Sequence, residues 1–177
     1  MMKKIVSVLA LMTAISSACA ADGTINFTGN IIDSACTVDL DGAGATTMDV
    51  AMGNVSKSSF TGVGSTAGGN ASATKFNILL KDCPETVSTA TVKFDGTAYS
   101  GDNSVLALTD ETGVATGVGI QLSDNSGVLS LFTESAAYTL TSGSNTNTLD
   151  FTARYIQKAA TVTAGKANSV ATFTVNY

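Results

Sequence analysis

The chain has 177 residues, enough for one domain or two very small ones, and it carries 9 basic against 14 acidic side chains. It contains no histidine, which excludes a histidine general base, a Ser-His-Asp triad and a histidine-ligated metal. The net charge of −5 argues against a nucleic-acid partner, because phosphate binding needs clustered cations. A charged fraction of only 13%, with abundant Thr, Val and Gly, predicts an all-β fold.

Residues 1–20 have the pattern of a cleaved signal peptide. A basic start and an apolar stretch precede Ala18-Cys19-Ala20, which offers a small-residue cleavage site. The stretch is too short to span a bilayer as a mature helix. The alternative is a lipoprotein signal acylated on Cys19, but Ser16 stands where that signal usually has a large aliphatic residue. We therefore expect export and a mature chain that starts at Ala21.

Two cysteines, Cys36 and Cys83, remain after this cleavage. In an exported chain, two cysteines are most simply a disulfide, since the compartment is oxidising. The alternative is a pair of free buried thiols. The signal peptide, the cysteine pair and the β-rich composition together indicate the periplasm or the cell surface.

Alternation of apolar and polar residues predicts a series of short strands along the mature chain. The first covers residues 24–38, as one long strand or two consecutive ones, and a loop rich in Gly and Ser interrupts the series at 53–72. The other expected strands lie at 46–51, 74–80, 91–94, 105–108, 118–122, 128–131, 138–140, 149–156 and 171–177. About ten short strands at this spacing predict a β-sandwich.

The polar residues indicate neither catalysis, nor a cofactor, nor a metal. Asp39, Asp41 and Asp49 lie near a glycine but lack the acidic spacing of a calcium loop, so we expect a solvated turn there. The other carboxylates are scattered. Three tyrosines could form a sugar-binding platform, but packing within the core or between strands explains them better; they are Tyr99, Tyr138 and Tyr155.

Both ends of the mature chain alternate in a way that a free terminus does not need. In residues 21–31 the odd positions are apolar or Gly, and the even positions from 22 to 30 are all polar. A terminus normally frays, whereas an alternating segment is typical of a strand with one buried face. The segment could be an ordinary first strand or could pair with a neighbouring molecule. The last strand raises the same question, with one apolar face made of Ala171, Phe173, Val175 and Tyr177.

These ends and several internal motifs resemble chaperone–usher pilins, specifically the major subunit of type 1-like fimbriae. The resemblance covers residues 21–177 in order, and no single motif carries it. The motifs are the extension with a central glycine at 27–39, the second cysteine after a strand at 76–83, Val105-Leu-Ala-Leu108, Gly117 to Leu122, Phe151 to Tyr155, Gly165 and the terminal 171–177.

The resemblance implies an incomplete immunoglobulin-like β-sandwich that lacks its last strand. A donor strand from a neighbouring subunit would complete it, by strand addition to an exposed edge. It implies a donor-strand extension at 21–32 and a pilin domain at 33–177. The donor residues would be Ile25, Phe27, Gly29 and Ile31, and the strand recognised by the chaperone and usher would present Phe173, Val175 and Tyr177.

The implied partners are identical pilin subunits, a periplasmic chaperone, an outer-membrane usher and other fimbrial subunits. The chain would pass through the periplasm into an extracellular, adhesive fimbrium. A minor or adaptor pilin and a small surface lectin stay open as alternatives, although the mature length leaves no room for the extra receptor-binding domain of a fimbrial adhesin. The resemblance departs at the C-terminus, where the family usually has one residue more after the position of Tyr177.

Overall fold

The computed structural model describes residues 25–29, 35–40, 42–67 and 74–177. Contacts divide the chain into a unit at 1–31 and a unit at 32–177. The expected signal peptide at 1–20 lies outside the described residues. In the first unit only residues 25–29 are described, and they form no strand, whereas the expected strand covered 24–38. The strand prediction is wrong for these five residues, because a strand needs a hydrogen-bonded partner and they have none.

The second unit is built of strands, which confirms the all-β prediction. Its described residues contain no α-helix and one short 3₁₀ turn, Lys57–Ser59. The larger sheet has the order β1-β3-β10-β7-β6-β5, with β2 also paired to β10 and β8 to β7. Its strands are β1 (Thr37–Asp39), β2 (Thr66–Ala67), β3 (Thr74–Lys81), β5 (Ala98–Tyr99), β6 (Asp102–Leu106), β7 (Val118–Asp124), β8 (Gly127–Val128) and β10 (Asn147–Gln157).

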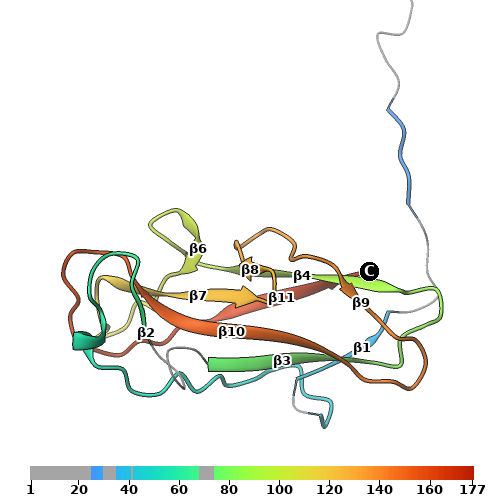
Figure 1. Cartoon of the computed structure of the whole chain (residues 1–177), viewed down its shortest axis with the longest axis horizontal. Helices are drawn as coiled ribbons and strands as arrows, with labels where there is room; N and C mark the ends of the chain where they lie inside the picture. The colour runs from blue at the N-terminus through green and yellow to red at the C-terminus, as the bar shows by residue number, and fades with distance from the viewer. Residues whose placement is uncertain (1–24, 30–34, 41, 68–73) are drawn as a thin grey trace, which may run out of the picture. The chain divides into compact units, whose positions relative to one another are not determined.

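The smaller sheet has the order β11-β4-β9, all antiparallel. It consists of β4 (Thr89–Gly96), β9 (Tyr138–Thr139) and β11 (Ala171–Asn176). Figure 1 shows β10 running between β3 and β7, with β11 beside β4. The pairing puts the first and the last strand of the second unit in different sheets, since β1 belongs to the larger sheet and β11 to the smaller.

The core lies between the two sheets. β10 confirms its predicted alternation, because its buried residues recur every second position from Leu149 to Tyr155. From the opposite sheet, β4 contributes Phe94, whose ring lies 5.1 Å from that of Phe151 in an edge-to-face arrangement. Such an aromatic pair contributes about 0.5–1.5 kcal/mol beyond its buried area. The two sheets are therefore held together as a sandwich by interdigitating apolar side chains.

A disulfide joins Cys36 to Cys83, with the two Cα atoms 4.2 Å apart, which confirms the predicted pair. It fastens the start of β1 to the residue that follows β3 and its turn. Beside it, the expected solvated turn is wrong for Asp39, which is 1% exposed. Its carboxylate accepts hydrogen bonds from the Gly42 amide and the Lys81 ammonium, so this Asp closes the turn after β1 from inside.

Candidate functional site

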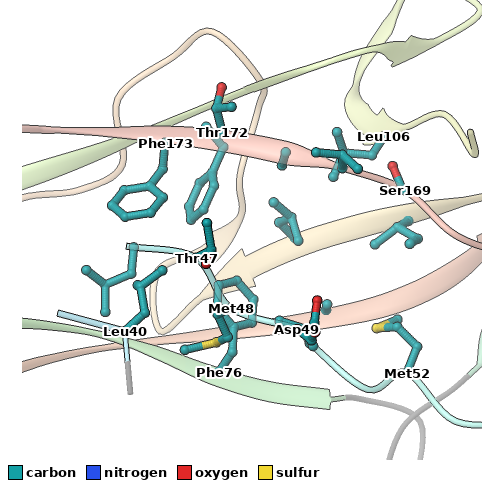
Figure 2. Close-up of a pocket in the computed structure, with 18 of the residues that line it drawn as sticks. Leu40, Thr47, Met48, Asp49, Met52, Phe76, Leu106, Ser169, Thr172 and Phe173 are labelled. Atoms are coloured by element: carbon teal, nitrogen blue, oxygen red, sulfur yellow. The ribbon is translucent and has the colours of Figure 1, made fainter. Parts of the chain in front are cut away.

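An open, apolar groove of about 1210 Å³ runs along the second unit. Its floor is the core itself, because side chains from both sheets reach it, among them Ile78, Phe94 and Ile120. Figure 2 shows the groove between β11, which carries Thr172 and Phe173, and the chain segment that carries Met48 and Met52. These floor residues are buried, and the apolar surface open to solvent comes from half-buried side chains on the sides of the groove, among them Met48 and Phe173. Such an apolar groove is a surface on which another chain can bind.

The groove has two walls. The anchored wall is β11 with the preceding residues 163–170, of which 167–170 line the groove, and the unpaired wall is residues 46–53. β11 lies at the edge of its sheet and pairs with β4 alone among the described strands. In an antiparallel pair, every second residue turns its amide and carbonyl away from the partner strand. The groove side of β11 is therefore a row of backbone groups without a partner strand.

Three sequence-predicted residues lie on the anchored wall. Phe173 and Val175 are half-buried and line the groove, and Tyr177 lies at its end with 40% of its surface exposed. The Tyr177 hydroxyl donates a hydrogen bond to the Cys36 carbonyl at 3.4 Å, and burial raises the pKa of this hydroxyl. The end of β11 is thus tied to the disulfide corner where the second unit begins.

The anchored wall is tied to the loop at 107–116. The Ala115 amide donates to Lys166 O and the Lys166 amide to Gly113 O, each at 2.8 Å. Glu111 adds side-chain bonds from Lys166 and Asn168, and these bonds lower the pKa of its carboxyl. This run of bonds fixes where β11 starts.

Gly165 allows this close approach. A Cβ placed on it would lie 2.5 Å from both the Gly113 carbonyl oxygen and the Ala115 nitrogen, closer than real Cβ atoms come. Its φ is outside the left-handed region, so space and not backbone conformation requires glycine here. A residue with any side chain would push the anchored wall away from its loop.

The unpaired wall has the pattern of a strand without being one. Met48, Val50 and Met52 are half-buried, and the residues between them are exposed. In the described part of the chain, residues 46–53 make no backbone hydrogen bond. The prediction of a strand at 46–51 is therefore wrong for the single chain, because no described strand lies beside this segment to pair with it.

Sequence reasoning did not identify the unpaired wall or the groove floor as functional. The sequence signal that could have identified the unpaired wall is the alternation at 46–52, which gives this segment one apolar face. The structure adds that no described strand pairs with it. The groove is apolar, and among the described residues that line it only Asp49 has a charged side chain. Such a surface binds apolar side chains on an extended backbone better than it binds a charged ligand.

The predicted donor residues that are described lie outside any strand. Ile25 is 79% exposed and Phe27 is 92% exposed. A Cβ on Gly29 would meet nothing within 4 Å, and its φ is outside the left-handed region, so the chain itself gives no reason for a glycine. The fourth predicted donor residue, Ile31, lies outside the described residues.

The described residues hold no group of three or more acidic, Cys or His side chains placed to bind a metal. No helix among them is long and apolar enough to cross a membrane.

Comparison with known proteins places these features in a family. Residues 25–177 match the family model described as fimbrial protein. A type 1 fimbrial subunit of Klebsiella pneumoniae is 41% identical, over 96% of this chain and 94% of the relative. The crystal structure of a Burkholderia pseudomallei antigen and type I fimbria protein is 45% identical, with a TM-score of 0.60, and covers 88% of this chain and 97% of its own.

The P pilus rod subunit PapA has the same fold, with a TM-score of 0.63 at 24% identity. That comparison covers 81% of this chain and 99% of PapA. The open groove thus occurs in a chain whose fold and sequence both match fimbrial subunits.

Proposed function

The chain belongs to the fimbrial protein family, whose members form extracellular surface fimbriae, and we propose that it is the repeating shaft subunit, assembled by donor-strand exchange. Residues 21–32 of one copy would lie in the groove of the next copy, between the anchored and the unpaired wall. The observation that carries this proposal is a groove with empty backbone edges on both sides, in a chain that also has an unpartnered alternating segment.

The chemistry of the segment matches the groove. An added strand would give β11 and residues 46–53 the hydrogen-bond partner that each lacks. Ile25, Phe27 and Ile31 would leave water for the apolar floor, and each fully buried side chain of this kind contributes about 1.5–3 kcal/mol. Gly29 would let the two backbones come close where the groove is shallow, which supplies the reason for glycine that the single chain lacks.

The same groove explains the proposed chaperone and usher steps. Before assembly an open groove exposes core side chains and invites edge-to-edge aggregation. A periplasmic chaperone that lends its own strand to the free edge of β11, across Phe173, Val175 and Tyr177, would protect it. At the outer-membrane usher, residues 21–32 of another subunit would then replace the lent strand.

The main test deletes residues 21–31. The truncated subunit is expected to keep its disulfide and to form a soluble chaperone complex, because its own core is intact. It is expected to be unable to join the groove of another subunit, while its own groove still accepts a synthetic peptide of residues 21–32 on a native gel. A peptide with Phe27→Asp is the matched control and is expected not to bind. Loss of every soluble chaperone complex would instead identify residues 21–31 as an ordinary first strand and would contradict the proposal.

Tyr177→Ser tests the chaperone step. It is expected to lower the periplasmic yield of subunit more than it lowers the dissociation temperature of assembled filaments, because the chaperone meets β11 at its free end. Tyr99→Ser, in β5 away from the groove, is the control. A normal periplasmic yield of Tyr177→Ser would count against the chaperone's use of this edge.

Electron microscopy of cells with and without the gene separates a shaft subunit from a minor one. Loss of all filaments is expected for the shaft subunit. Filaments that persist, shortened or without tips, would assign the chain to a minor or adaptor position.

A further inference from the structure

Two of the five methionines of the chain, Met48 and Met52, lie on the unpaired wall of the groove. The other three, Met1, Met2 and Met12, belong to the expected signal peptide. The mature chain would thus hold all of its thioether sulfur in one place, four residues apart on the same face of one segment. Figure 2 shows both sulfur atoms beside the groove.

Both side chains are half-buried, and Met52 packs against the core. They are thus accessible to a small solute while the groove is open, and a strand lying in the groove would cover them. Among the described residues, the backbone of 46–53 makes no hydrogen bond, so no neighbouring strand covers this segment. Access to the two sulfur atoms therefore depends on whether the groove is occupied.

We propose that Met48 and Met52 are oxidation sites through which a peroxide blocks the groove of a subunit that neither the chaperone's strand nor a donor strand yet occupies. This inference rests on the proposed function. The thioether sulfur donates an electron pair to one peroxide oxygen, an S–O bond forms as the O–O bond breaks, and water leaves. The sulfur is oxidised by two electrons, the peroxide is reduced, and the product is methionine sulfoxide.

Sulfoxide formation changes the wall from apolar to polar. The new S–O group accepts hydrogen bonds from water in the open groove, and an entering donor strand would remove that water. A buried polar group without a hydrogen bond weakens the complex, and we expect binding of the donor segment to fall roughly tenfold. The reaction is reversible by a methionine sulfoxide reductase, so oxidation would stop assembly without destroying the subunit.

The test compares purified mature subunit with assembled filaments after treatment with hydrogen peroxide. Peptide mass spectrometry is expected to find one added oxygen on Met48 and Met52 in the open subunit, and much less in filaments. The treated subunit is expected to bind a fluorescent peptide of residues 21–32 roughly tenfold more weakly. Treatment with a methionine sulfoxide reductase is expected to restore binding.

The matched variant is Met48→Leu with Met52→Leu, which nearly conserves volume and has no thioether. It is expected to bind the peptide equally well before and after peroxide. If the oxidised wild-type subunit binds as well as the untreated one, or if the double variant loses as much affinity, this inference is wrong and the proposed function stands. If the untreated subunit does not bind the peptide at all, the proposed function fails and this inference fails with it.

Discussion

The two walls line the same groove but differ in how they are bonded to the rest of the chain. In the anchored wall, residues 163–170 precede β11 and are hydrogen-bonded through backbone and side chains to the loop at 107–116. The unpaired wall, residues 46–53, has the alternation of a strand but no backbone hydrogen bond. One wall is thus held in place by bonds within the chain, whereas the other has no partner strand among the described residues to hold it in strand geometry.

Hydrogen exchange measures this difference most directly and should show the largest effect. In the free subunit, amides at 47–53 are expected to exchange at least about a thousandfold faster than those of Ala115 and Lys166, because the latter open only with larger parts of the fold. Addition of the peptide 21–32 is expected to slow exchange at 47–53 specifically. Equal protection of the amides of the two walls in the free subunit would contradict the claim that they are held differently.

Replacing both Cys36 and Cys83 by Ser tests what holds the start of the unpaired side. The disulfide closes a loop that spans 47 positions and contains residues 46–53. Its removal is expected to lower the free energy of unfolding by about 4 kcal/mol, measured by denaturant titration. Reduction of the wild-type protein is the control and should give a similar loss; a loss below about 1 kcal/mol would mean that the loop is held by packing alone.

Gly165→Ala tests how firmly the anchored wall is held against its loop. The new Cβ would meet Gly113 and Ala115, and we expect a loss of about 1–3 kcal/mol in the free energy of unfolding. Gly29→Ala is the matched control, because a Cβ there meets nothing, and it should change subunit stability by less than about 0.5 kcal/mol. Equal stability of the two variants would show that the anchored wall yields as easily as the unpaired one.

Asp102→Asn gives the smallest effect and carries a pH signature. The Lys158 ammonium, at 2.6 Å, and Ser104 lower the pKa of the Asp102 carboxyl to about 2. Because the folded value lies below the ordinary 3.8, the pair stabilises the fold above pH 4 or so and is lost as the pH falls toward 2. The melting temperatures of wild type and variant are therefore expected to differ at pH 7 and to converge near pH 2. A difference that is constant with pH would rule out the charge as its origin.

The sequence predicted the longer strands that the chain pairs by itself, but not β2, which lies in the expected loop at 53–72, nor the two-residue β5. β10 alternates because it is buried on one face between two partner strands, so its pattern and its structure agree. The disulfide followed from the number of cysteines and the expected compartment. Both predictions depend only on contacts within one chain.

Two of the failed strand predictions have a common cause. Residues 25–29 and 46–51 have strand patterns, yet neither is in a strand in the single chain. Alternation indicates that a segment suits a strand with one buried face, but not which strand it pairs with, and the described residues give these two segments no partner strand. Asp39 fails for a different reason: the sequence shows an acidic turn but not that Lys81, 42 positions away, enters it to compensate the charge.

The Cys36–Cys83 bond also has a mechanical consequence. In a filament, a pull on residues 21–32 would be transmitted along the chain to Cys36 and through the disulfide to Cys83, just after β3. The intervening chain, with the unpaired wall inside it, is closed into a loop by this bond. These 47 positions correspond to about 160 Å of extended polypeptide that tension cannot release unless a covalent bond breaks.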